Sequence, residues 1–272
     1  MSLVLYFIIG VIFGSFLNVV ILRIPKDESV VFVSSHCFSC NAPLKPWHNV
    51  PLLSWFFLRG KCAFCGEKIS IEYPLIEFLS GVIFVLVFAK LGFYYPAFLV
   101  SFAFLSLLAL SVIDIKYQMV PDSLNLLAIV FAIFASFEFD GILLNFQNAL
   151  LAAGGFTLLR FSLSYILTAK ERNLALKNRP SWSKKYHTYP FVEVMGEGDI
   201  MVAATMGALL GIKLMLVAVF LSALLALPVL LYLQTKSTNS PRVAFVPFLA
   251  LATFLVYVLD SEAYRFLEAL YS

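Results

Sequence analysis

The chain has 272 residues, of which 61% are hydrophobic and only 13% are charged, and its mean hydropathy is +0.93. A soluble globular domain is nearer half apolar and a quarter charged, so this composition excludes an ordinary soluble protein and indicates a polytopic membrane protein. The net charge of +3 is too small to indicate nucleic-acid binding, and we expect the lipid bilayer, not a nucleic acid, as the partner.

Eight apolar runs have about the length that is needed to span a bilayer. The sequence therefore predicts an all-α polytopic membrane protein with about eight transmembrane helices. The pair between 199 and 233 is the least distinct, because only a short turn around Gly211 separates its two runs. The runs cover residues 3–23, 74–92, 96–114, 122–139, 145–168, 199–212, 213–233 and 243–260.

Positive charge predicts the orientation of these helices. Basic residues follow the run 3–23 and none precedes it, whereas a cleavable signal peptide has the reverse order, so we expect a retained first helix with its N-terminus outside the cytoplasm. The cytoplasmic segments, with the flanking Arg23 and Arg160, then hold 16 of the 19 Lys and Arg, which is the asymmetry typical of cytoplasmic loops. These segments are 24–73, 115–121, 169–198 and 234–242.

The loop 24–73 carries all four cysteines of the chain, as two Cys-x-x-Cys pairs. Two such pairs at this separation are typical of a zinc ribbon, in which four thiolates surround one zinc ion tetrahedrally. Two disulfides are the alternative, which a reducing cytoplasm disfavours. We expect His36 and His48 not to be ligands, and the metal ligands to be Cys37, Cys40, Cys62 and Cys65.

Polar residues near two helix ends allow two interpretations each. Ser15 and Asn18 lie three residues apart and therefore share one helix face. One interpretation is that these small and polar residues pack helices closely. The other is that Asn18 faces a substrate or cofactor cavity. Glu77 follows Tyr73-Pro74, and it suits the first turn of a helix or, slightly inside the membrane, contributes to a polar site.

Two carboxylates lie where apolar runs meet the predicted cytoplasmic face. Asp114 closes the run that ends near residue 114, and Asp199 opens the next one after Gly196 and Gly198, which permit a sharp turn and a close approach. Ionisable groups at membrane depth are costly, so both are candidate functional residues. Asp122, directly after Pro121, is expected to be an N-cap.

Two carboxylates that lie close together cannot both ionise easily, so they would share one proton. The dipoles of the predicted helices indicate which of the two would hold it. Asp114 is expected at a helix C-terminus, which disfavours ionisation, and Asp199 at a helix N-terminus, which favours it. We therefore predict that Asp199 is the ionised base and that Asp114 carries the proton. The basic loop 169–198 is expected to be solvated and to face lipid head groups, and residues 261–272 to be a C-terminal tail.

Together these features resemble the type IV prepilin peptidases, which are membrane aspartyl proteases with a Gly-x-Gly-Asp motif. The resemblance extends from the first helix to the last and depends on several independent motifs. The loop before Gly196 is long for that family and separates the two aspartates by 85 residues. The motifs are Gly14-Ser15-Phe16-Leu17-Asn18, the paired Cys-x-x-Cys, Tyr73-Pro74-Leu75-Ile76-Glu77, Ile113-Asp114 through Pro121-Asp122, and Gly196-Glu197-Gly198-Asp199.

The resemblance implies an activity, its site and its substrates. It implies that Asp114 and Asp199 are the catalytic pair, supported by Gly196, Gly198, Asp122, Asn18 and Glu77. Residues 1–23 would be the first helix, 24–73 the zinc-binding loop associated with methylation, 74–260 the protease helices and 261–272 the tail. It further implies cleavage of type IV prepilins and type II secretion pseudopilins at the cytoplasmic face of the bacterial inner membrane, and methylation of the new N-terminus with S-adenosylmethionine.

Two other functions stay open on the residues alone. One is a non-enzymatic membrane assembly subunit that docks a partner through its zinc ribbon, with the aspartates as helix caps. The other is an ion-coupled transporter that uses intramembrane carboxylates. The oligomeric state, the particular substrates and the residues that bind S-adenosylmethionine are not indicated by the sequence.

Overall fold

A computed structural model describes residues 3–31, 36–37, 39–177, 195–236 and 243–271 of the chain. These residues form helices and loops, and the β-structure within them is limited to two isolated bridges, His36 with Pro43 and Lys61 with Lys68. The predicted all-α class is confirmed.

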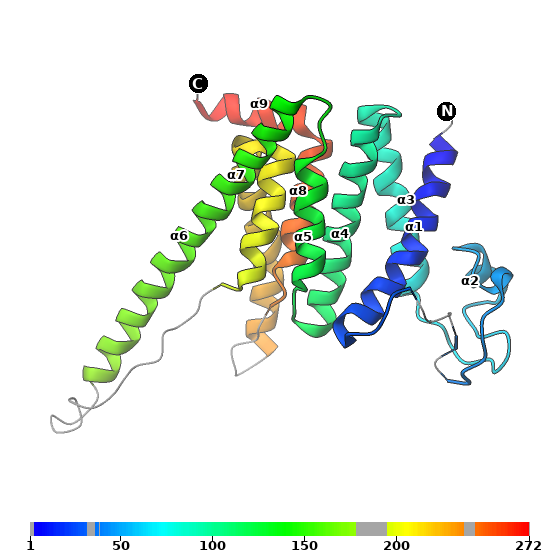
Figure 1. The fold of residues 1–272 in the computed structure, drawn as a ribbon. Helices are drawn as coiled ribbons and strands as arrows, with labels where there is room; N and C mark the ends of the chain where they lie inside the picture. The colour runs from blue at the N-terminus through cyan, green and yellow to red at the C-terminus, as the bar shows by residue number, and fades with distance from the viewer. Residues whose placement is uncertain (1–2, 32–35, 38, 178–194, 237–242, 272) are drawn as a thin grey trace.

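All eight apolar runs form helices. Seven helices carry them, because α7 contains two: non-helical backbone at Gly211, with φ 70° and ψ 165°, divides that helix where the sequence predicts a turn. Figure 1 shows the chain reversing its direction there. The helices are α1 (Leu3–Arg23), α3 (Glu72–Leu91), α4 (Tyr95–Tyr117), α5 (Asp122–Ile133), α6 (Phe139–Lys177), α7 (Glu197–Lys236) and α8 (Val246–Val258).

Five of the described helices are long and apolar enough to cross a membrane by length and composition, and six if α8 and α9 (Asp260–Tyr271) count as one bent span. Two predicted boundaries are wrong. The run 122–139 stops being helical at Ile133, and α5 has only 12 residues. The segment 169–177 continues α6 instead of forming a loop, and 178–194 lies outside the described residues.

The helices alternate in direction, so that the ends of α1 and α4 lie at the same end of the bundle as the starts of α3, α5, α7 and α8 (Figure 1). Both chain termini lie at the opposite end. There α9 meets α8 at 90°, so the predicted tail is an amphipathic helix that crosses the end of the bundle. Lys90 fastens it through an ion pair of 2.7 Å with Asp260.

Glycines let α1 and α3 approach closely. A Cβ atom added at Gly10 would lie 2.5 Å from the Ser80 carbonyl oxygen, and one added at Gly14 would lie 2.8 Å from the Cα of Glu77. Small residues at such a crossing bring backbones together, which is how membrane helices gain packing energy without a hydrophobic driving force between them. The Gly14-Ser15 part of the first motif is therefore a helix-packing element.

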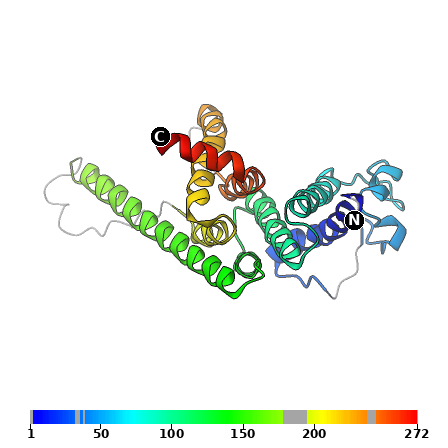
Figure 2. The ribbon, with the colours of Figure 1, turned by 90° about the horizontal axis from the view of Figure 1, so that it is seen from above.

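The loop 24–73 forms a small separate body beside α1 and α3, as Figures 1 and 2 show. It contains two short 3₁₀ turns and the five-residue helix α2 (Leu53–Phe57). Trp55 closes it by donating from Nε1 to the Ile69 carbonyl at 3.2 Å. The left-handed Gly60, with φ 65°, lies against the same indole, where a Cβ atom would be 2.9 Å from the ring.

Candidate active site

Asp114 lies one turn before the end of α4 and is 8% exposed. Its Oδ2 accepts a hydrogen bond from the backbone N–H of Val246 at 3.2 Å, and the N–H of Phe245 also donates to the carboxylate. Phe245 and Val246 are the N-cap and the first residue of α8. The carboxylate therefore caps a helix 132 residues away in sequence, where orphan N–H groups and the positive end of the dipole favour an anion.

Asp199 lies in the first turn of α7 and is half-buried. Its carboxylate accepts a hydrogen bond from the backbone N–H of Gly196. A Cβ atom at Gly196 would meet only Asp199 Oδ2, at 3.7 Å, which is an ordinary contact. The side chain of Glu197 points outward and pairs with Arg160 of α6 at 3.2 Å.

Gly198 has a different structural role from Gly196, because it allows a close contact between two segments. A Cβ atom at Gly198 would lie 2.6 Å from the Cβ of Val120 and within 3.0 Å of both its methyl carbons. Val120 lies in the connection between α4 and α5, directly after the segment that carries Asp114. The second glycine of the motif thus lets the start of α7 lie against the end of α4, and this contact brings the two aspartate-bearing segments together.

The two carboxylates are close enough for the charge of Asp114 to act on Asp199. They meet at the same end of the bundle, one on a helix that ends there and one on a helix that begins there. The expected positions at helix ends are confirmed, since Asp114 lies near the C-terminus of α4 and Asp199 in the first turn of α7, but these two dipoles do not by themselves assign the proton. Asp114 faces the N-terminus of α8 as well as the C-terminus of its own helix, so both carboxylates receive backbone N–H donors and the helix ends do not separate their roles.

Asp122 does not have the role that the sequence predicts. Pro121 is the N-cap of α5, no side chain makes a capping hydrogen bond there, and Asp122 is exposed in the first turn. The charge of Asp122 is therefore favourable near the positive end of the helix dipole, but its side chain does not cap the helix. The reason is that the helix starts one residue earlier than expected, at the proline.

Asn18 connects α1 with the start of α3, and Glu77 connects α3 with the loop 24–73. Asn18 donates from Nδ2 to the Tyr73 carbonyl at 3.2 Å, so it serves helix packing at the start of α3. Glu77 is buried at 8% exposure, and its Oε2 accepts the backbone N–H of Leu52 at 2.7 Å, while Ser15 donates to the same carboxylate. Leu52 holds a strained backbone with φ 60° and ψ −53° directly before α2. Glu77 is thus the point at which the loop is attached to the bundle.

The four cysteine sulfurs form one cluster, in which every pair lies within 4.8 Å. Cys37 and Cys65 have their Sγ atoms 3.8 Å apart and all four thiols are free, so the cluster is not a pair of disulfides. Zinc–sulfur bonds of about 2.3 Å in a tetrahedron place sulfurs about 3.8 Å apart, which the Cys37–Cys65 separation matches. The donor set and its spacing fit a single tetrahedral metal ion.

Backbone turns shape both halves of this cluster in the same way. The N–H of Asn41 donates to the Cys37 carbonyl at 2.9 Å, and the N–H of Gly66 donates to the Cys62 carbonyl at 3.0 Å. Both residues have positive φ, 54° and 73°, which Asn and Gly adopt most easily. Hydrogen bonds from backbone N–H groups of Cys40 and Ser39 lower the pKa of the Cys37 thiol to about 6, whereas burial and hydrogen bonds among the thiols raise the pKa of Cys65, so Cys37 is the first of the two to become the thiolate that binds metal.

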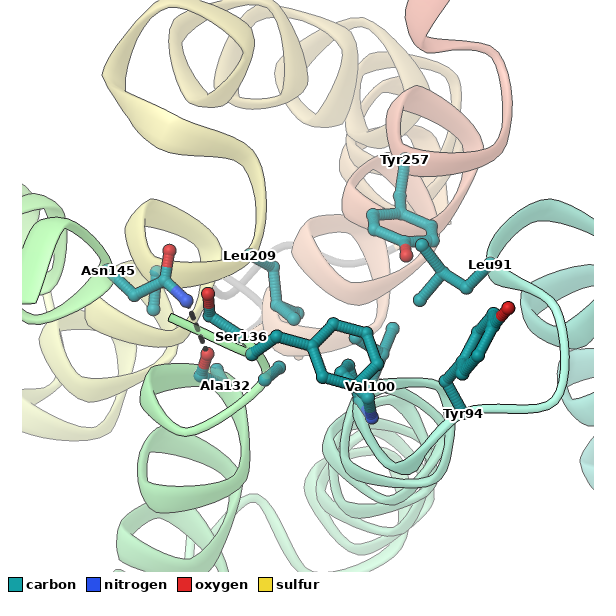
Figure 3. Close-up of a pocket in the computed structure, with 12 residues that line it drawn as sticks. Leu91, Tyr94, Val100, Ala132, Ser136, Asn145, Leu209 and Tyr257 are labelled. Atoms are coloured by element: carbon teal, nitrogen blue, oxygen red, sulfur yellow. Dashed lines mark hydrogen bonds between the residues drawn. The ribbon is translucent and has the colours of Figure 1, made fainter. Parts of the chain in front are cut away.

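A pocket of about 300 Å³ lies at the other end of the bundle (Figure 3). Leu91 and Tyr94 from the α3–α4 connection, Ser136 from the α5–α6 connection, and Tyr257 from the end of α8 line it. Asn145 points into it but is already bonded to the Ala132 carbonyl at 3.3 Å. Its described lining residues include no carboxylate, histidine or cysteine, so this pocket is not the site of the aspartate chemistry.

Sequence reasoning missed three residues that shape the site, and one buried polar residue on α5. Val120, Leu52 and Val246 act through their backbone or their bulk, which leaves no pattern to recognise. Asn125 is fully buried on α5, one turn after the helix starts, and neither polar atom of its side-chain amide has a hydrogen-bond partner within the described parts of the chain. A lone Asn among apolar residues was a signal that could have been noticed.

Comparison with known proteins agrees with this arrangement. Residues 8–91 match the family model described as the bacterial Peptidase A24 N-terminal domain, and residues 101–231 match the type IV leader peptidase family. No solved structure matches the chain.

Curated relatives match almost the whole chain. A protein of Neisseria gonorrhoeae is 32% identical over 95% of this chain and 91% of its own length, and one of Stutzerimonas stutzeri is 31% identical over 90% and 86%. A protein of Aeromonas hydrophila is 30% identical over 91% and 87%. All three are named prepilin leader peptidase/N-methyltransferase. With both family models matched in order and relatives of 30–32% identity over nearly the full length, the chain belongs to the type IV leader peptidase family.

Proposed function

We propose that this protein cleaves the leader peptide from type IV prepilins and type II secretion pseudopilins and then methylates the new N-terminus. The observation that carries the proposal is that Asp114, near the end of α4, and Asp199, in the first turn of α7, lie at the same end of the bundle, close enough for the charge of one to act on the other. The names of the relatives supply the substrate class and the second activity. Cleavage would occur where the substrate leaves the bilayer, because both carboxylates lie near helix ends.

The chemistry needs the pair to hold one proton between them. One ionised aspartate takes a proton from water while the other, protonated, donates a hydrogen bond to the scissile carbonyl. The water oxygen then bonds to the carbonyl carbon, the amide C–N bond breaks, and the amine leaves with a proton. Two nearby carboxylates resist double ionisation, which favours the state in which they share one proton.

Methylation is assigned to the loop 24–73, with one zinc ion and S-adenosylmethionine as the methyl donor. Cys37, Cys40, Cys62 and Cys65 would hold the zinc, whose role is to fix the two turns of the loop to each other. Glu77 would hold that loop beside the membrane helices through Leu52. The amine that cleavage releases would then be methylated near the place where it forms.

The aspartates would lie at the cytoplasmic face of the bacterial inner membrane. Supporting this orientation, the helix ends at the aspartate side carry the basic segments, while Lys90, Lys213 and Arg265 belong to the other side. Labels placed at positions 141 and 262 are then accessible from outside only. Labelling of either position from the cytoplasmic side alone would reverse the orientation.

The two alternative functions receive less support. A transporter would place its carboxylates near the middle of the membrane, whereas Asp114 and Asp199 lie within one turn of helix ends. A docking subunit would use its aspartates only as caps. Asp114 does cap α8. A nearby second carboxylate, that of Asp199, does not strengthen this cap, and placing two like charges close together costs free energy.

Incubation of the purified protein with a prepilin, with and without S-adenosylmethionine, tests both activities. Asp114→Asn and Asp199→Asn each keep an oxygen that accepts the backbone N–H bonds, so these variants should fold, insert and lose cleavage. Asp122→Asn is the matched control, since Asp122 is exposed and bonds no cap, and it should cleave normally. Full cleavage by either paired-aspartate variant would refute the assignment.

A further inference from the structure

Helix α2 presents large apolar side chains outward. Leu53, Phe56 and Phe57 are 55%, 68% and 83% exposed, although they belong to a five-residue helix in a loop that the sequence places in the cytoplasm. Trp55 of the same helix points the other way and is bonded to the Ile69 carbonyl. The helix thus has an inner face that holds the loop together and an outer face that nothing in the described chain covers. Contiguous exposed aromatic and aliphatic side chains of this kind mark an interaction surface.

The depth of α2 is fixed by its attachment to Glu77. Glu77 is the sixth residue of α3, so its Cα lies about 7.5 Å along the helix from the first residue, at 1.5 Å per residue. Its carboxylate bonds the Leu52 N–H, so the start of α2 lies beside the first two turns of α3 and not beyond its end. The helix Glu72–Leu91 is itself one of the candidate membrane spans. Figure 1 accordingly shows α2 beside the lower parts of α1 and α3 and not beyond their ends.

Exposed apolar side chains also lie on α3, close to Glu77 in sequence. On α3, Leu75 and Phe78 lie on either side of Glu77 in sequence, and both are exposed in a spanning helix. Directly after α2 come the exposed cations Arg59 and Lys61. Apolar side chains followed by cations are the composition of segments that lie in the boundary between acyl chains and anionic head groups.

We propose that α2 is inserted in the head-group boundary of the bilayer at the aspartate end, with Leu53, Phe56 and Phe57 among the acyl chains. The loop 24–73 is then a membrane-bound body, held on one side by Glu77 and on the other by lipid. Its ligand is the lipid surface itself, and this binding requires neither of the proposed enzymatic activities. A second copy of the chain or a peptide segment on this face is the competing occupant, and the test distinguishes them.

Photocrosslinking in nanodiscs of anionic and zwitterionic phospholipid tests the proposal. The photoreactive residue p-benzoyl-phenylalanine is placed at Phe57, at Leu75 as a lipid-facing control on α3, and at Glu67 as an exposed, charged control on the second cysteine turn. After illumination, mass spectrometry of the full chain detects lipid adducts. We expect adducts at Phe57 and Leu75 and none at Glu67.

Three results would overturn the proposal: adducts at Leu75 but not at Phe57, equal adducts at Phe57 and Glu67, or crosslinks from Phe57 to protein in place of lipid. The Glu77→Ala variant gives an independent measurement, since it removes the acceptor for Leu52 but leaves the zinc ligands and α2 unchanged. Lipid adducts at Phe57 should be lost or strongly reduced in this variant, while those at Leu75 persist. Undiminished adducts at Phe57 would show that Glu77 does not set the depth of α2.

Discussion

Replacing Gly198 with alanine tests the contact that brings the two aspartate-bearing segments together. The added Cβ would lie 2.6 Å from the Cβ of Val120, whereas carbon atoms in contact lie at about 3.5–4.0 Å, so the segments must separate by about 1 Å. No rotation of Val120 relieves the clash, because its Cβ is fixed by the backbone. Asp199 is the next residue and must move with Gly198.

The expected effect follows from this displacement. Overpacking of about one methyl group costs roughly 1–3 kcal/mol of stability. A shift of about 1 Å in a catalytic group costs on the order of a hundredfold in rate. We therefore expect Gly198→Ala to lower kcat/KM for prepilin cleavage by roughly 10- to 100-fold while the protein still inserts and binds zinc.

Two other glycines provide matched controls for the assay in detergent or nanodiscs. A Cβ at Gly196 meets Asp199 Oδ2 at 3.7 Å, and a Cβ at Gly154 on α6 meets nothing within 4 Å. Gly196→Ala keeps the backbone N–H that bonds Asp199 and should cleave nearly normally. Gly154→Ala should cleave normally and be slightly more stable, because alanine favours a helix interior by up to about 1 kcal/mol.

A second substitution, at Val120, tests whether the clash with Gly198→Ala causes the loss of cleavage. Val120→Gly removes all three atoms that crowd the new Cβ, so the double variant Gly198→Ala with Val120→Gly should recover most of the lost cleavage. Normal cleavage by Gly198→Ala, or a loss that Val120→Gly does not restore in a protein with normal zinc content, would show that this contact does not position Asp199.

Three further predictions concern residues outside the aspartate pair. Glu77→Gln keeps an acceptor for the Leu52 N–H and Glu77→Ala removes it, so only the alanine variant should lose hydrogen-exchange protection at Leu52, at a cost of about 1.5–3 kcal/mol. Asn125→Leu replaces a buried amide that has no partner and should stabilise the protein by about 1–3 kcal/mol in thermal unfolding, and a lower Tm would contradict this. Changing Cys37 and Cys62 together to serine should remove zinc on metal analysis and impair methylation more than cleavage, and equal loss of both activities would argue against the separate roles.

The sequence predicts well those features that depend on residues close together along the chain. Apolar runs of spanning length became helices, because a backbone in lipid must satisfy its own hydrogen bonds. The turn at Gly211 and the cysteine cluster were also recognisable, since a positive φ and paired Cys-x-x-Cys turns have their own residue signatures. Helix ends were predicted less well, as α5 and the extended α6 show.

The features that the sequence could not predict depend on contacts between distant segments. Asp114 reads as a residue at a helix C-terminus, where its charge would be unfavourable, because nothing in the sequence indicates that α8 begins against it. Glu77 reads equally well as a first-turn residue or a polar site until Leu52 is seen to donate to it. In both cases the hydrogen-bond donor is a backbone N–H. Every residue except proline has one, so the residue type at the donor position does not reveal the contact.

This use of backbone donors decides how the aspartates can be tested. Neither Asp114 nor Asp199 has a salt bridge among the described residues, and each carboxylate is oriented by N–H groups from a helix start. An amide oxygen accepts the same bonds, so substitution by asparagine removes the charge and the shared proton while leaving the positions of α4, α7 and α8 nearly unchanged. Had lysine or arginine held the pair, the same substitutions would have left a buried cation unpaired, and loss of activity would be confused with loss of structure. Here an inactive but stably inserted asparagine variant is evidence about the chemistry itself.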